Sequence, residues 1–573
     1  MSMLVGGIDT GLEAFGIYAF AVREGLVWLL VASAVYMLLR AGIFALPQIG
    51  LMSIGAYVSA VAALDWNLPI AATIPLSMAI TAAVGAGLAL LLRRLDGITL
   101  AIATIGFSEI VRLVARDLEV TGAAIGLVGI PRDVTDVHLL LGGALAVAML
   151  VRLDGSRFGT AMDLVRVDQV VAAHQGVVVA RHRMTLFVAA GLLCGAAGSL
   201  YVQMLGFVEP QLFDFAALIN VVSATVLGGA NHAFGPLAGV VIIFGAPHAA
   251  AAFFEHLRDF FGGIVLVLVI AFAPRGVLTE FASFVRLVRA KCRPSGAGVS
   301  HALAPANDDL AVSPLVGLRA GPAVVVSAVS KHYGGVRALE EVSFSVEPGE
   351  LFGLIGPNGS GKSTLLNVLS GATHATAGEV RVGANLLRNG SPASAVSAGV
   401  FRTFQGIRLL PDASVEENIR VGALSRDRLG LLDSLRRRTP PGSGTRFASP
   451  SVTDVLAASG LVGFADHDAM SLPYGAQRRT EIARALMAAP RVLLLDEPTA
   501  GMSIDESEEI VSLLGQLSDF GVTVVLVEHD LRLMVESCHR LAVLNFGRLI
   551  AVGSPAEVVA IEEVIDAYVG RPS

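Results

Sequence analysis

About nine apolar runs, spread over residues 26–275, constrain most strongly what this chain can fold into. Apolar residues make up 54% of the chain and charged residues only 16%, whereas soluble domains average about 45–50% and about 25%. A membrane-spanning helix needs about 20 apolar residues, and several runs are shorter, so their boundaries are soft. The pattern predicts an all-α membrane domain with about nine or ten helices over residues 1–291. The runs are 26–40, 43–64, 68–92, 98–114, 137–151, 184–205, 215–229, 232–254 and 261–274.

Three groups of basic residues fit the cytoplasmic side of a membrane under the positive-inside rule. They are Arg93 and Arg94; Arg152, Arg157, Arg166, Arg181 and Arg183; and Arg275, Arg286, Arg289, Lys291 and Arg293. The loop 115–136 then falls outside. Nine spans place the N-terminus outside, and a tenth span over 3–22 places it inside, so both topologies stay open. The first residues include no early Lys or Arg, unlike a secretory signal peptide.

Glycine and proline interrupt the apolar runs at 43–57 and 227–239. Irregular backbone at membrane depth is tolerated where it is buried in protein or lines a cavity, so broken helices around a translocation path are one interpretation. Close helix packing through small residues is the other. Glu109 and Arg112 are costly inside lipid, and we interpret them as a pair near a membrane edge rather than a substrate site.

Net charge and cysteine content exclude other classes of function. The formal net charge of −7 argues against nucleic acid as a main partner. The three cysteines, Cys194, Cys292 and Cys538, lie far apart and predict neither a disulfide framework nor a zinc site. Cys194 lies in an apolar run, where we expect a small packing residue.

The composition changes after residue 291. Residues 292–321 are rich in Pro, Gly, Ala and Ser and read as a flexible linker. Beyond them, over 322–573, short β-branched strands such as "LFGLI", "RVLLL" and "VTVVLV" alternate with helical stretches. We therefore expect a multi-domain chain in which the membrane domain precedes a soluble α/β domain.

The stretch Gly356–Ser363, "GPNGSGKS", matches the pattern G-x-x-x-x-G-K-[ST] and is called the phosphate loop below. A strand is expected before it and a helix after it, as the pattern requires. Glycines let backbone N–H groups turn toward phosphate oxygens, and the helix N-terminus adds partial positive charge. Lys362 is predicted to reach the β- and γ-phosphates, and the Ser363 hydroxyl to bind Mg²⁺.

An acid pair follows the apolar strand in "RVLLLDEPTAG". Asp496 suits Mg²⁺, and Glu497, which points differently, suits the activation of an attacking water. The sequence "VLVEHD" repeats the pattern of a strand followed by polar residues, and His529 is a candidate contact for the γ-phosphate. A structural histidine is the alternative.

The order of the phosphate loop, "FRTFQ", "SLPYGAQRR", "LLLDEP" and "VEHD" resembles the nucleotide-binding domain of ATP-binding cassette (ABC) transporters. The resemblance implies a P-loop domain with a helical subdomain at about 409–487, ATP as substrate and Mg²⁺ as cofactor. It implies that Tyr333 stacks on adenine, that Gln405 senses Mg²⁺ and the membrane domain, and that "SLPYGAQRR" caps ATP on a partner domain. The implied ATP-binding residues are Tyr333, Gly356, Asn358, Gly359, Gly361, Lys362, Ser363, Thr364 and Gln405; the implied signature residues are Tyr474, Gly475 and Gln477; and the implied Mg²⁺ ligands are Ser363, Gln405 and Asp496.

The signature departs from the usual Leu-Ser-Gly-Gly-Gln, because Pro473 stands where the serine hydroxyl would meet phosphate. A weakened trans site and harmless subfamily variation are both interpretations. "YG-x-QRR" and the tail at 544–570, a closing hairpin and helix, look like the LivG-like ATP-binding proteins of the branched-chain amino acid (hydrophobic amino acid uptake) family. Residues 425–451 look like an insertion, or a solvated loop.

The apolar half resembles the matching LivM-like permease over about 40–260, in stretches such as "ITLAIATIGFSEIVRLV" and "TGAAIGLVGIPR". Residues 156–177 look like the cytoplasmic helix that couples such a permease to its ATPase; an ordinary charged loop is the alternative. The resemblance implies half of an ATP-hydrolysing importer for branched-chain or related small amino acids or amides in a bacterial inner membrane. Implied partners are a second permease, a second ATPase and a periplasmic binding protein. A homodimeric exporter or flippase, or a membrane-anchored regulatory ATPase, is the alternative.

Overall fold

The computed structural model describes residues 19–230, 232–245, 323–388, 390–411, 413–426, 431 and 450–569. These residues form two compact units. Apart from Leu431, the first unit takes in the described residues 19–166 and 179–245, and the second takes in 167–178 together with those from 323 onward. The predicted run 261–274, the linker 292–321 and most of the insertion 425–451 lie outside the described residues.

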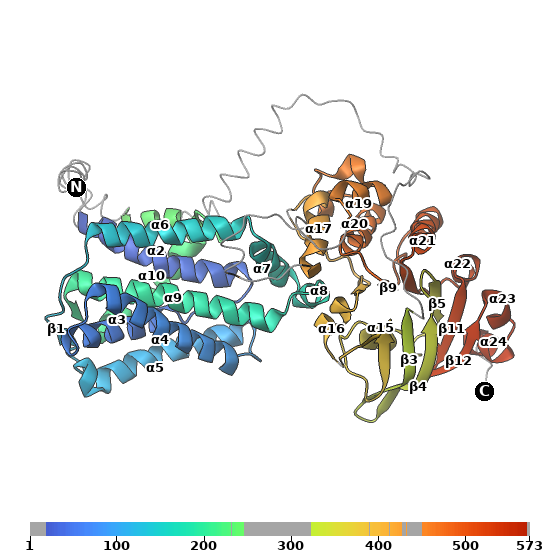
Figure 1. The fold of residues 1–573 in the computed structure, drawn as a ribbon, viewed down its shortest axis with the longest axis horizontal. Coiled ribbons are helices and arrows are strands. Elements are labelled where there is room, and N and C mark those ends of the chain that lie inside the picture. The colour runs from blue at the N-terminus through green and yellow to red at the C-terminus, as the bar shows by residue number, and fades with distance from the viewer. Residues whose placement is uncertain are drawn as a thin grey trace. The chain divides into compact units, whose positions relative to one another are not determined.

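The first unit is helical, as expected from the apolar runs (Figure 1). Each of the first eight runs overlaps a helix, although the second begins with non-helical residues before α3. Five helices in the described part of the chain, α2, α4, α5, α6 and α9, are long and apolar enough to cross a membrane. The helices are α2 Ala19–Arg40, α3 Gln48–Leu64, α4 Ile70–Leu91, α5 Gly97–Asp117, α6 Asp136–Asp154, α7 Arg157–Val167, α9 Val179–Leu205, α10 Phe215–Gly228 and α11 Gly235–Val240.

Small residues let α3, α4 and α9 pack closely. A Cβ built on Gly55 of α3 would lie 2.7 Å from the Cα of Gly195 on α9, too close for any side chain. Close packing through small residues, one of the two interpretations of the stretch 43–57, is therefore observed at Gly55. Interruptions are present too, since the described residues 43–47, 230 and 232–234 are not helical.

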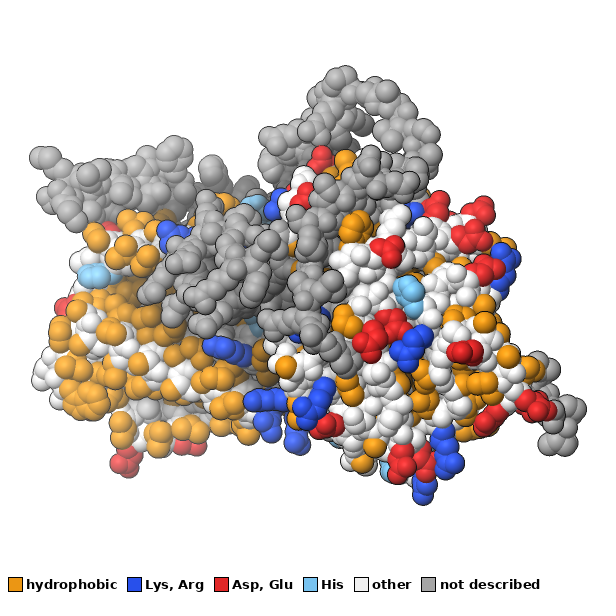
Figure 2. Space-filling view, turned by 45° about the vertical axis from the view of Figure 1, so that its right-hand side comes forward, with side chains coloured by type: hydrophobic (Ala, Val, Ile, Leu, Met, Phe, Trp, Pro, Cys, Tyr) orange, Lys and Arg blue, Asp and Glu red, His pale blue; other side chains and the backbone are white. Residues whose placement is uncertain are grey.

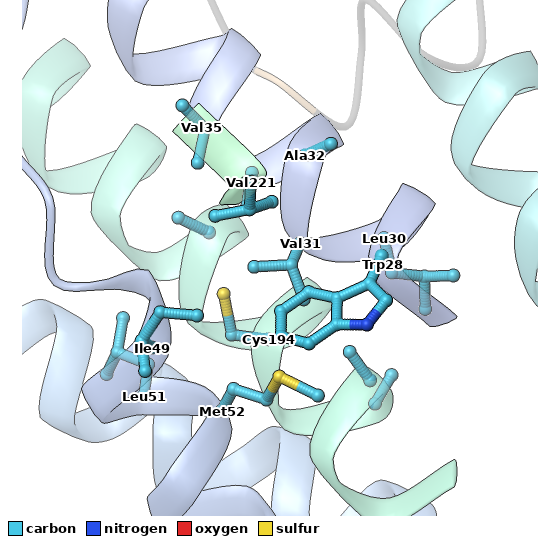
Figure 3. Close-up of a cluster of buried hydrophobic side chains, with 14 of the residues drawn as sticks. Trp28, Leu30, Val31, Ala32, Val35, Ile49, Leu51, Met52, Cys194 and Val221 are labelled. Carbon is cyan, nitrogen blue, oxygen red and sulfur yellow. The ribbon is translucent and has the colours of Figure 1, made fainter. Parts of the chain in front are cut away.

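The core of the first unit surrounds α2 and α9 (Figure 3). Cys194 of α9 is fully buried and lies among Trp28, Ile49 and Met52. Its thiol is free, as is that of Cys538. Cys194 is thus the small packing residue that the sequence predicts.

The outer surface of the first unit is apolar. Large hydrophobic side chains such as Leu91, Ile102 and Leu145 are more than half exposed, and hydrophobic side chains cover much of this unit in the view of Figure 2. Extended apolar surface of this kind is typical of a face that meets lipid or another protein. On α5, Glu109 and Arg112 form the expected ion pair.

The second unit contains two sheets. One has the order β12-β11-β5-β10-β9-β8, parallel except for β12, and the other is the antiparallel sheet β4-β3-β6-β7. The predicted strands are found, and the hairpin and helices expected near the C-terminus are β11, β12, α23 and α24. The strands are β3 Val324–Tyr333, β4 Val336–Val346, β5 Leu351–Ile355, β6 Ala377–Val382, β7 Asn385–Leu386, β8 Val400–Arg402, β9 Val492–Asp496, β10 Thr523–Val527, β11 Arg540–Asn545 and β12 Arg548–Gly553.

Helices pack against strands of the parallel sheet, and a helical part lies in the sequence between β8 and β9. Its α17, α19 and α20 share a hydrophobic core with β5, β9 and β10. The helices of this unit are α8 Gln169–His174, α15 Lys362–Leu369, α16 Pro392–Ser397, α17 Val415–Val421, α19 Val452–Ala458, α20 Tyr474–Met487, α21 Ile504–Asp519, α22 Leu531–Ser537, α23 Pro555–Val558 and α24 Glu562–Val569.

Candidate functional site

Four neighbouring parallel strands bring the candidate residues to one edge of the sheet. In the order β5-β10-β9-β8, Val527 pairs with Leu354 on one side and with Asp496 on the other. The phosphate loop follows β5, Glu497 follows β9, and His529 follows β10 by two residues. Because ligands of open α/β sheets bind at the carboxyl ends of the strands, this edge is the expected place for a phosphate site.

The phosphate loop has the backbone that its glycines predict. Gly356, Gly359 and Gly361 have φ values of 148°, 81° and 107°, a region that other L-residues rarely adopt. Helix α15 begins at Lys362, directly after the loop. The loop therefore places a helix N-terminus where anions bind.

Lys362 is buried, and its Nζ donates hydrogen bonds to the carbonyl oxygens of Gly356 (2.7 Å) and Pro357 (3.0 Å). Burial lowers the pKa of Lys362, and the nearby carboxylates of Glu497 and Asp496 oppose this shift. The ammonium group thus lies against the phosphate loop, where it is predicted to contact the phosphates.

The other predicted ATP-binding residues lie at accessible positions. Asn358, Gly359 and Ser363 are exposed and Thr364 is half-buried, all in or beside the phosphate loop. Tyr333, at the end of β3, is 47% exposed, and the Nζ of Lys331 lies 4.7 Å from the centre of its ring. An exposed aromatic face suits stacking.

Glu497 is held between two of the other predicted residues. The Nε2 of Gln405 donates to one carboxylate oxygen of Glu497 at 2.7 Å, and the Nε2 of His529 lies 2.5 Å from the other. Glu497 also has a φ of 48°, in the left-handed region that costs a side chain about 1–3 kcal/mol. Strain of this kind concentrates at functional sites, so the backbone and both contacts single out Glu497.

Asp496 has a partner that the sequence interpretation missed. Its carboxylate accepts a hydrogen bond from the Nη2 of Arg402 at 2.8 Å, and both side chains are buried. Arg402 also donates to Asn367 at 2.6 Å. Burial lowers the pKa of Arg402, and Asp496 partly offsets that shift. The stretch "FRTFQ" contains this arginine, but the family resemblance assigns a role only to its glutamine.

Glu528 is a second missed residue. Its buried carboxylate accepts hydrogen bonds from the backbone N–H and hydroxyl of Thr499, at 2.9 and 2.6 Å, and from the N–H of His529, at 3.2 Å. Thr499 lies two residues beyond Glu497, so Glu528 ties the loop after β9 to the loop after β10. These hydrogen bonds fix the backbone near Glu497 relative to the backbone of His529.

The signature begins α20. Pro473 is the N-cap residue and makes no side-chain cap, so the first turn lacks the hydroxyl acceptor that a serine provides. Tyr474 is 41% exposed and Gly475 is buried. The Nε2 of Gln477 donates to the carbonyl oxygens of Met470 and Leu472 and so fastens the loop before the helix.

The segment 167–178, which lies in the sequence of the apolar half, belongs to the second unit. Asp168 caps α8 by accepting from the N–H groups of Val170 and Val171, and its other carboxylate oxygen pairs with Arg408. The His174 ring meets Phe404 edge-on at 5.2 Å between centroids. Burial lowers the pKa of His174.

Comparisons with known proteins match the two halves of the chain to two families. The ABC transporter family model matches residues 339–500, and the model for the permease component of branched-chain amino acid transport systems matches 17–270. The high-affinity branched-chain amino acid transport ATP-binding protein BraF of Pseudomonas aeruginosa is 35% identical over 252 residues, which cover 44% of this chain and 98% of BraF. LivG of Escherichia coli, with the same description, is 34% identical, with 44% and 98% covered.

Other relatives differ in what their names say they import. The ribose import ATP-binding protein RbsA 2 of Rhizobium etli is 34% identical over 253 residues, and this chain spans about half of its length, 47%. A crystal structure of an ATP-binding cassette of an ABC transporter, in its ADP conformation, is 30% identical, with 44% of this chain and 100% of that one covered and a TM-score of 0.39.

BraF and LivG are matched over nearly their whole length. The matches to the two family models place a permease component and an ABC cassette in one polypeptide. The chain therefore belongs to the ABC transporters, and it is a membrane protein that joins a permease of the branched-chain amino acid transport type to an ATPase that hydrolyses ATP to drive transport.

Proposed function

We propose that this chain is the permease and ATPase half of an importer for branched-chain amino acids or related small amino acids or amides, in a bacterial inner membrane. The observation that carries the proposal is the attachment of the segment 167–178 to residues beside Gln405. This segment interrupts the permease sequence, so a movement at the nucleotide site has a direct covalent route into the permease half.

The residues at the sheet edge support hydrolysis of ATP by an activated water. Glu497 is the proposed general base, and Gln405 and His529 orient its carboxylate before the reaction. Lys362 supplies positive charge to the phosphates, and the first turn of α15 offers N–H groups to them. Tyr333 stacks on the adenine.

The donor set fits Mg²⁺, which commonly uses one or two carboxylates together with substrate phosphates and water. In the described residues no group of three or more His, Cys, Asp or Glu forms a metal site by itself. Ser363, Gln405 and Asp496 are the side chains that would hold the ion, and Mg²⁺ supplies charge neutralisation on the phosphates when bound.

One chain supplies one permease and one ATPase, so we propose a second of each, together with a periplasmic binding protein. The signature residues Tyr474 and Gly475 start a helix and are proposed to cap ATP bound to the partner ATPase. Support for the substrate class comes from the permease model and from BraF and LivG. Because RbsA 2, a ribose import protein by name, is similarly identical, the resemblance of the ATPase half alone does not identify the substrate.

Replacement Glu497→Gln tests the hydrolytic site. The variant keeps the size and hydrogen bonding of the side chain but loses the base, so ATP hydrolysis should slow by roughly 10²–10⁴-fold while ATP affinity is retained. Glu379→Gln, which changes an exposed glutamate on β6, is the matched control. Near-normal hydrolysis by Glu497→Gln would reject the assignment.

Native mass spectrometry of the complex, extracted mildly from its own membrane, tests the proposed partners. A heteromer that contains a second permease, a second ATPase and a binding protein supports the importer. A plain homodimer without a binding protein would contradict it and favour export.

A further inference from the structure

Helix α20 carries a buried ion cluster beyond its signature. Arg478, Glu481 and Arg484 lie three residues apart along one face, with side-chain exposures of 0%, 1% and 5%. An Nη1 of Arg478 donates to Glu481 at 2.7 Å, and an Nη2 of Arg484 lies 3.7 Å from it. Burial lowers the pKa of Arg484, and Glu481 opposes that shift.

The cluster grips the backbone of residues 404–408, here called the bridge segment. Arg478 donates to the carbonyl oxygens of Phe404 and Gln405, both at 2.7 Å. The N–H of Arg408 donates to Glu481 at 2.7 Å, and Arg484 donates to the carbonyl oxygen of Arg408 at 2.7 Å. Both ends of the bridge segment are therefore fixed by one buried cluster.

The bridge segment has no helix or strand of its own, so these bonds define its position. Its side chains point to two functional places. Gln405 reaches Glu497 at 2.7 Å, while Arg408 pairs with Asp168 and Phe404 meets the ring of His174. The guanidinium of Arg408 also lies 5.1 Å from the centre of the Phe404 ring, which ties the two contacts together.

Glu481 is central to this arrangement, because it pairs with Arg478 and accepts from the Arg408 backbone through different carboxylate oxygens. Without the negative charge of Glu481, the positive charges of the buried Arg478 and Arg484 would be less compensated. Removing one partner of a buried charged network disturbs the remaining partners strongly.

We propose that Glu481 is a positioning residue that makes the bridge segment a rigid link between the catalytic glutamate and the segment 167–178. The proposal rests on the roles given above to Glu497 and to the segment 167–178. Glu481 touches neither in this arrangement; it acts by fixing Gln405 at one place and Arg408 at the other.

The test compares variants of the full chain in vesicles made from its own membrane, with ATP as the varied ligand. Glu481→Gln should lower kcat for ATP hydrolysis roughly 10-fold to 100-fold, since small misplacements of catalytic groups have effects of that size. KM for ATP should stay within about twofold, because the bonds of the cluster described above go to residues 404–408 and not to the phosphate loop. Arg478→Lys, which keeps the charge but cannot donate to two carbonyls in the same way, should give the same split.

A double-variant cycle tests whether the cluster couples the segment 167–178 to Glu497 or only stabilises the fold. Asp168→Ala should change kcat in the otherwise unchanged chain, and this effect should shrink to within about twofold when Glu481→Gln is already present. The control background is Glu416→Gln, which alters an ion pair with Arg420 on α17 in the same helical part. There the effect of Asp168→Ala should be retained in full.

Three results would overturn the proposal. Equal effects of Asp168→Ala in the Glu481→Gln and Glu416→Gln backgrounds would make the cluster a structural brace only. A raised KM with unchanged kcat would place its influence on nucleotide binding. No effect of Asp168→Ala in the unchanged chain would refute the link itself, and it would also remove the proposed coupling route while leaving the hydrolytic role of Glu497 to its own test.

Discussion

The replacement Arg402→Met probes how the strand-end acid is held. Arg402 pairs with Asp496 at 2.8 Å, and the side chains are only 6% and 10% exposed. Methionine removes the guanidinium but retains much of the volume, so Asp496 is left as a buried carboxylate without its cation. Breaking a buried pair in this way costs about 3–5 kcal/mol.

The size of the effect can be expressed as a change in melting temperature. For a unit of this size, about 1 kcal/mol corresponds to roughly 2–4 °C, so the thermal transition of the second unit should fall by roughly 6–20 °C. Thermal unfolding of the full chain, without nucleotide, measures this shift. The transition of the second unit is the one that ATP raises.

Arg381→Met is the matched control. Arg381 pairs with Glu379 at 2.9 Å, but these side chains are 48% and 44% exposed, and such surface pairs contribute only about 0–1 kcal/mol. Each variant thus removes one arginine–carboxylate pair of nearly the same length, but Arg402 is buried and also donates to Asn367, whereas Arg381 is exposed. Adding Asp496→Asn to Arg402→Met should recover part of the loss, because it removes the uncompensated charge. Equal shifts for Arg402→Met and Arg381→Met would refute the reasoning.

Three further changes test other parts of the account. Lys362→Ala should weaken ATP binding itself, because it removes the cation of the phosphate loop, and unchanged affinity in equilibrium binding would count against that role. Acidification should loosen the segment 167–178. Burial lowers the pKa of His174 below its ordinary 6.5, so the neutral ring favours the packed state above pH 6.5 and this contribution is lost as the pH falls toward the lowered pKa. Hydrogen exchange of the segment at pH 7.5 and 5.5 should show this loss, and His174→Asn should abolish the pH dependence. Pro473→Ser should stabilise α20 by about 1 kcal/mol as a new N-cap while leaving the ATPase rate within about twofold; a larger change in rate would show that the altered signature affects function.

Local signals in the sequence were sufficient for the elements and for the phosphate loop. Glycine spacing predicts the backbone of Gly356–Ser363, and an apolar strand predicts where Asp496 and Glu497 emerge, because these depend on neighbouring residues. Except for α7, which no apolar run covers, the helices of the first unit were also predictable from apolar runs, although not near their ends. Non-helical residues precede α3 because Pro47 stands directly before it.

The contacts between motifs could not be read in the same way. Arg402 and Asp496 lie 94 residues apart, and they meet only because β8 and β9 are neighbours in the sheet. The cluster on α20 did leave a signal, since Arg478, Glu481 and Arg484 recur at every third position in a helix that is otherwise largely buried. Three charges on one buried face indicate a specific partner, which the sequence alone does not identify.

Transport by inside-out membrane vesicles tests the central claim most directly. In such vesicles added ATP reaches the ATPase, and the lumen corresponds to the outside of the cell. Vesicles loaded with a periplasmic extract and, in separate samples, with radiolabelled leucine, glutamine or urea should release at least one label when ATP is added, and Glu497→Gln vesicles should retain it. ATP-driven accumulation of label in the lumen, or an equal response of the wild type and Glu497→Gln, would contradict an importer powered at this site.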